Sequence, residues 1–129
     1  MNADPSGDLA KLIKSAIAEQ LASMAVAQPC KVISFDEPSG IAVVQPLMQL
    51  TDEPTSPIQT VPVLGHKYRT ESGIIKRERH ILEPGDTVYI VCADRQIKDA
   101  MKGQFGKPTS LRSHDKNDAV IVGVFPCSL

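Results

Sequence analysis

Apolar side chains in the first part of the chain recur every three or four residues. Polar side chains such as Lys11, Ser15 and Glu19 mostly fall between them. This spacing predicts an amphipathic helix over residues 5–27, which Pro29 would end because proline cannot continue a helix. The apolar stripe consists of Leu9, Leu12, Ile13, Ala16, Ile17, Leu21 and Met24.

After Pro29 the pattern changes to short apolar runs divided by turn residues, which is typical of β-strands. The turns are marked by Glu37-Pro-Ser-Gly40 and by Pro84-Gly85. A short helix is expected from Asp94, as its N-cap, to about Lys102. The predicted strands span residues 31–36, 41–45, 58–64, 86–92 and 119–125, with residues 65–73 as a long hairpin tip, residues 73–82 as a charged segment compatible with a strand, and residues 103–118 as a loop.

This order of elements leaves no room for long crossover helices, so the sheet must be largely antiparallel. Five strands with a short helix before the last one suit a small barrel of the OB type. We therefore predict a mainly β fold, in which an N-terminal α-helix (residues 1–28) precedes a five-stranded OB-type antiparallel barrel (residues 29–129). Aromatic residues make up only 4% of the chain and Trp is absent, so the core must be built from Val, Ile, Leu and Ala.

The charge balance limits the classes of partner. The formal net charge of the 129 residues is -1, whereas a dedicated nucleic-acid binder usually carries a basic excess. No apolar run approaches the roughly 20 residues that span a bilayer, and the N-terminus lacks the apolar core of a signal peptide. We therefore expect synthesis in a cytosol and retention there until assembly.

The residues that usually carry chemistry are scattered. The three cysteines, Cys30, Cys92 and Cys127, are far apart, and the first two lie in apolar runs, which indicates buried thiols rather than a disulfide framework. No HExxH, CxxC, HxH or phosphate-binding glycine motif occurs. Residues 113–115 read Ser-His-Asp, but side chains of neighbouring residues diverge and do not form a triad. We expect no enzyme activity, and no catalytic, cofactor-binding or metal-binding residue is predicted.

Two features instead indicate binding surfaces. A lone helix of this length is marginal in water, so its stripe must be covered by the barrel of its own chain, by copies of itself or by another protein. The stripe residues proposed for an interface are Leu9, Ile13, Ile17, Leu21 and Met24. The basic run at residues 75–80 suits a partner surface formed by Lys76, Arg77 and Arg79; a nucleic-acid patch and a merely solvated strand are its alternatives.

A series of weak motifs adds a resemblance, because their order and spacing run through about 100 residues. They are Val32 to Asp36, Ile41-Ala-Val-Val-Gln-Pro46, Val61-Pro62-Val63, Pro84-Gly85-Asp86, Asp94-Arg95-x-Ile97 and Arg112-x-His114-x-x-x-Asp118-Ala119. In this respect the chain resembles the N-terminal OB-fold domain of phage cell-puncturing spike proteins, which belong to the baseplates of contractile tails.

The resemblance implies a structural virion protein: a homotrimeric central spike or hub plug, assembled into the baseplate in the host cytoplasm. Its partners would be a hub protein and a separate tip protein, because larger relatives carry their own β-helix and a metal-bearing HxH apex that this sequence lacks. Nucleic acid is not an expected partner, whereas transient contact with the host envelope is compatible with this role. The alternatives are a single-stranded nucleic-acid-binding OB module and a small hydrolase.

Six residues of these motifs are predicted to hold loops to the barrel, with a partner contact as the alternative role of Arg95, Arg112 and His114. Gly85 permits a tight turn, and Asp118 can accept hydrogen bonds from backbone amides where the last strand begins. The complete set is Gly85, Asp86, Arg95, Arg112, His114 and Asp118.

Overall fold

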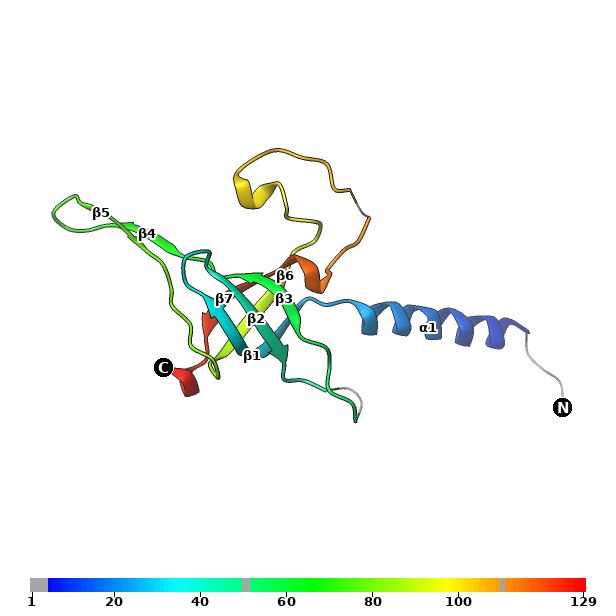
Figure 1. Ribbon diagram of the computed structural model, residues 1–129. Helices are drawn as coiled ribbons and strands as arrows, with labels where there is room; N and C mark the ends of the chain where they lie inside the picture. The colour runs from blue at the N-terminus through cyan, green and yellow to red at the C-terminus, as the bar shows by residue number, and fades with distance from the viewer. Residues whose placement is uncertain (1–4, 50–51, 110) are drawn as a thin grey trace.

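The computed structural model describes residues 5–49, 52–109 and 111–129. These residues form a mainly β fold with one N-terminal helix, a curled five-stranded antiparallel sheet and a second, two-stranded sheet (Figure 1). The elements are α1 (Pro5–Ser23), β1 (Ala27–Asp36), β2 (Ile41–Pro46), β3 (Ile58–Pro62), β4 (His66–Arg69), β5 (Ile75–Glu78), β6 (Thr87–Cys92) and β7 (Ala119–Val124), with 3₁₀ turns at Ala100–Lys102, Lys116–Asp118 and Pro126–Ser128.

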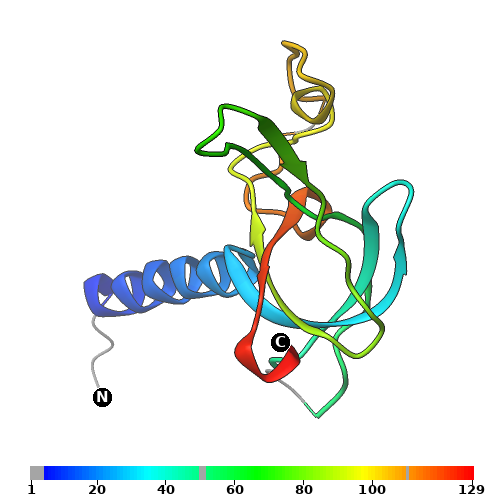
Figure 2. The ribbon, with the colours of Figure 1, turned by 90° about the vertical axis from the view of Figure 1, so that its left-hand side faces the viewer.

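The larger sheet has the strand order β3-β2-β1-β6-β7, and each neighbouring pair is antiparallel. The prediction of a mainly β, antiparallel fold preceded by a helix is thus confirmed. Register shifts interrupt three of the pairings, one of them between Val32 and Ser34. Because such irregularities bend strands and increase their twist, the sheet curls strongly (Figure 2).

The curl brings the two edge strands of this sheet together at one point. Val63, directly after β3, forms an isolated parallel bridge with Ile121 of β7. The backbone N–H of Leu64 donates to the carbonyl oxygen of Ile121 at 3.1 Å. Strands that are far apart in the sheet order therefore enclose a common interior.

This interior holds the hydrophobic core, which is aliphatic as the composition predicts. Among the described residues its buried members include Val44, Val61, Val88, Ile90 and Ile121. Cys30 and Cys92 are also buried, which confirms their prediction as small core residues, whereas Cys127 is exposed; all three cysteines are free thiols.

Helix α1 ends at Ser23, earlier than predicted, and Pro29 lies inside β1. The backbone leaves the helix because other segments bind it: Ala25 donates its N–H to the carbonyl oxygen of His114 at 2.9 Å, and Val26 accepts from the N–H of Cys92 at 2.8 Å. None of the described residues of α1 is buried, and the helix projects away from the sheet (Figure 1). Cover by the barrel of its own chain, one of the three options left by the sequence, is therefore wrong.

Two other predictions need correction. The expected hairpin tip at residues 65–73 contains strand β4, which pairs with β5, so only residues 70–73 turn. The expected helix from Asp94 to Lys102 is only a 3₁₀ turn at Ala100–Lys102, although Gly103 does end it with a left-handed φ of 70°. Asp94 caps no helix, because its carboxylate pairs with His114 instead.

Candidate functional site

The loop between β6 and β7 is anchored to the sheet by Asp118, the one buried charged side chain among the described residues. Its carboxylate accepts hydrogen bonds from Nε and Nη2 of Arg112 at 2.7 and 2.9 Å, and from the backbone N–H of Ile97 at 3.3 Å. The hydrogen bond to Asp118 raises the pKa of Arg112 above its ordinary value. The carboxylate thus ties both ends of the loop to the start of β7.

His114 joins this loop to the segment that follows α1. It adopts a left-handed φ of 48°, and its Nε2 lies 3.2 Å from a carboxylate oxygen of Asp94. Its backbone N–H donates to Ala93 at 3.2 Å, while its carbonyl accepts from Ala25. Arg95 lies beside this pair and donates from Nη1 to the Asp94 carbonyl oxygen at 3.0 Å.

The turn before β6 is built by Gly85 and Asp86. Gly85 has a φ of 97°, a conformation that favours glycine. Asp86 accepts the backbone N–H of Glu83 on its carboxylate at 2.9 Å. The backbone of the turn also exchanges two 2.8 Å hydrogen bonds with Val32 of β1. Gly85 and Asp86 thus bind this turn to β1, while Arg95, Arg112, His114 and Asp118 form contacts within the loop between β6 and β7.

The β4–β5 hairpin has two chemically different faces. Its register places Lys67 opposite Arg77 and Arg69 opposite Ile75. Directly opposite residues share a face of the sheet, so these four residues form one face, called the cationic face below. The other face carries His66, Tyr68, Lys76 and Glu78 and is called the tyrosine face.

The tyrosine face is bonded within itself. The hydroxyl of Tyr68 donates to Oε1 of Glu78 at 2.8 Å, which raises the pKa of Tyr68. The ring of His66 packs edge-on against His80 with centroids 4.8 Å apart. Because Lys76 lies on this face, the three cations predicted as one partner surface are divided between different surroundings.

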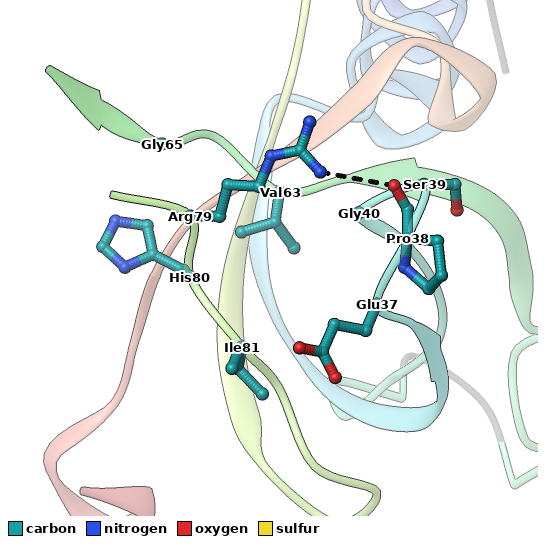
Figure 3. Close-up of a pocket in the computed structure, with 9 residues that line it drawn as sticks. All are labelled: Glu37, Pro38, Ser39, Gly40, Val63, Gly65, Arg79, His80 and Ile81. Atoms are coloured by element: carbon teal, nitrogen blue, oxygen red, sulfur yellow. Dashed lines mark hydrogen bonds between the residues drawn. The ribbon is translucent and has the colours of Figure 1, made fainter. Parts of the chain in front are cut away.

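The root of the hairpin is held by two contacts. Arg79 turns back toward the sheet, and its Nη1 donates to the carbonyl oxygen of Pro38 at 3.3 Å (Figure 3). A Cβ on Gly65 would lie 2.7 Å from the carbonyl oxygen of Glu78, so only glycine allows the two strands to approach there. A hollow of about 650 Å³ lies between this root and the β1–β2 turn. Arg79, predicted as part of a partner surface, thus contacts the β1–β2 turn of its own chain.

Helix α1 presents the predicted apolar stripe to solvent. Among the five stripe residues proposed for an interface, exposure ranges from 40% at Met24, which follows the last residue of α1, to 63% at Leu21. Leu9, Ile13 and Ile17 lie between these values. Leu9, Ile13, Ile17 and Leu21 therefore share one exposed helix face, without a covering segment among the described residues. Met24 was predicted to belong to this helix but lies just beyond its end.

The described part of the chain brings no familiar catalytic arrangement together. It contains no group of three or more His, Cys, Asp or Glu side chains that could hold a metal ion. Ser113, His114 and Asp115 form no triad, because His114 pairs with Asp94 and Asp115 accepts the backbone N–H of Asn117 at 2.8 Å. Within the same residues, no helix is long and apolar enough to cross a membrane.

No family model matches this sequence, and no curated protein matches it.

Sequence reasoning missed three residues of the hairpin: Lys67, Arg69 and Gly65. The first two lie on the cationic face, and the third permits its close packing at the root. The alternation Lys-Tyr-Arg at residues 67–69 was the available indication, since side chains two apart on a strand share a face.

Proposed function

We propose that this protein is a structural, self-associating OB-type barrel of a contractile-tail baseplate, acting as a central spike or hub plug without catalysis of its own. The observation that carries the proposal is the exposed apolar stripe on a helix that projects away from its sheet. Association with copies of the chain or with another protein would remove this apolar surface from water.

Burial of the stripe would supply a useful part of the assembly energy. Its five residues are each about half exposed, and full burial of such a side chain contributes roughly 1.5–3 kcal/mol. Covering the remaining area would therefore contribute on the order of 5 kcal/mol per protomer. Copies of α1 packed against one another would provide this cover in a homotrimer, and closed cyclic symmetry suits a position on a tail axis.

The assignment to a tail rests on the resemblance of the motifs, with support from the strand arrangement. An order of β3-β2-β1-β6-β7 whose edges meet at the Val63–Ile121 bridge fits a partly open, five-stranded OB-type barrel. The neighbours in a baseplate would be a hub protein and a separate spike-tip protein.

Light scattering tests the self-association. The wild-type mass at micromolar concentration should be three times the 13.9 kDa of the chain. The double substitution Ile13→Asp with Ile17→Asp should give a monomer with an unchanged β-sheet circular dichroism signal, because charges are costly in a buried apolar site. Ser15→Asp is the matched control, since helical geometry places Ser15 on the opposite face of α1. A monomeric wild type would refute the assembly.

Electron microscopy tests the assignment to a tail separately. Gold-labelled antibodies against the chain should bind at the baseplates of intact contractile tails. If the protein is a trimer but no label binds to such particles, the self-association is supported and the assignment to a baseplate is refuted.

A further inference from the structure

The two faces of the β4–β5 hairpin differ in how their charges are balanced. On the tyrosine face, Glu78 accepts the hydroxyl hydrogen of Tyr68 and lies two residues from Lys76 on the same strand, so this face carries one formal charge of each sign. On the cationic face, no ion pair links Lys67, Arg69 or Arg77 to an acidic side chain within the described residues. The formal charges of Lys76 and Glu78 cancel on the first face, whereas the second face carries three positive charges and no negative one.

This arrangement has a cost that a partner would remove. Lys67 lies directly opposite Arg77, and like charges in this position destabilise a pair of strands. A two-stranded hairpin is marginally stable by itself, yet this one projects from the sheet (Figure 1). An anionic surface against the cationic face would neutralise the repulsion.

The composition of the face indicates the class of partner. Ile75 completes it and is 45% exposed, and the adjacent Ile74 is 59% exposed. Arginine beside exposed apolar side chains is typical of protein–protein interfaces. Sequence-tolerant nucleic-acid binding uses aromatic rings for base stacking, but Tyr68, the aromatic residue of the hairpin, lies on the other face.

We propose that the cationic face docks on an acidic, partly apolar surface of a second protein. This inference deepens the proposed function and rests on it for the partner's identity, which in a baseplate would be the hub or tip protein. Lys67, Arg69 and Arg77 pair with carboxylates, while Ile75 packs against apolar side chains between them. Arg79 sets the direction in which the hairpin projects, through its bond to Pro38.

The test compares two neighbouring cations that the hairpin directs to opposite faces. A fluorescein-labelled peptide of twelve glutamates and a labelled twelve-nucleotide oligo-dT are titrated with the full chain at low salt, with fluorescence anisotropy as the measurement. Arg77→Gln should weaken binding of the glutamate peptide about fivefold, the upper range for an exposed ion pair. Lys76→Gln removes the same charge from the tyrosine face and should change binding less than twofold. High salt should abolish the difference.

Several outcomes would overturn the proposal. Equal effects of the two substitutions would mean that overall charge, rather than a face, binds the peptide. If the cationic face bound the oligo-dT more tightly than the glutamate peptide, the partner would be a nucleic acid. If neither probe bound, the cationic face would be a solvated surface without a partner. Lys67→Gln provides a second variant, whose loss should match that of Arg77→Gln. Because the titration requires no trimer, face-selective binding by a monomer would support this inference and refute the proposed self-association.

Discussion

Asp118→Asn should be the most informative lesion in the loop between β6 and β7. The substitution keeps the size of the side chain and replaces Oδ2, which accepts from Nε of Arg112, with an amide group that donates. The bonds to Oδ1 from Nη2 of Arg112 and from the N–H of Ile97 can persist, but without a full negative charge. One charge-assisted bond is lost and another is weakened.

The magnitude follows from the burial of this carboxylate. A hydrogen bond to a charged group contributes roughly 1.5–3 kcal/mol, and loss of one partner of a buried ion pair costs about 3–5 kcal/mol. The side chain of Asp118 is 2% exposed, whereas that of Arg112 is 30% exposed, so water can replace part of what Arg112 loses. We therefore expect the free energy of unfolding to fall by about 3 kcal/mol, the lower end of the range.

Urea unfolding followed by circular dichroism measures this change. The midpoint should fall by roughly 1–2 M with an unchanged slope, because the slope reports the surface exposed on unfolding. Asp94→Asn is the matched control: that side chain is 86% exposed in its pair with His114, so the expected loss is below about 1 kcal/mol. Equal losses in the two variants would refute the assignment of Asp118 as the anchor.

Three further predictions concern the hairpin root and the cysteines. Gly65→Ala should destabilise by about 1–3 kcal/mol, since the new Cβ forces backbone apart, while Gly123→Ala, which meets no atom within 4 Å, should be nearly neutral by the same urea assay. In the native protein, dithionitrobenzoate should react rapidly with Cys127 alone, and prompt reaction of three thiols would contradict the buried positions of Cys30 and Cys92. Burial raises the pKa of Cys30 from 9.0 to about 11, so stability should fall as the pH rises from about 9 to about 11, where only the unfolded thiol ionises; Cys30→Ala should reduce this fall.

The sheet could be predicted because its strands are short apolar runs bounded by turn residues. Strand β6, for example, is apolar almost throughout and begins just after the Pro84-Gly85 turn. The sequence of β6 does not show which of its side chains face the core, and the structure buries Val88, Ile90 and Cys92. The end of α1 could not be predicted in this way, because it depends on contacts of Ala25 and Val26 with segments distant in the sequence.

The hairpin was only partly predictable because burial does not mark it. All residues of β4 and β5 are exposed, so no alternation of apolar and polar positions distinguishes their faces. The basic run was recognised, but its division between two faces depends on pairing with a strand that the sequence suggested was a loop. Arg79 illustrates the same limit, since its partner is the carbonyl of Pro38, 41 positions away.

The cationic face depends on a turn that carries no positive charge. A shift of one residue in strand pairing would move every side chain of one strand to the other face. The register is fixed by the turn, in which Thr70 donates its N–H to Ile74 at 2.8 Å and Gly73, with a φ of 84°, donates to Thr70 at 2.9 Å. Lys76 and Arg77, which are adjacent in the sequence, therefore lie on opposite faces of the hairpin. Lys67 and Arg77 lie opposite each other on the same face. The register of the two strands, rather than the order of basic residues in the sequence, thus determines which positive charges share a face.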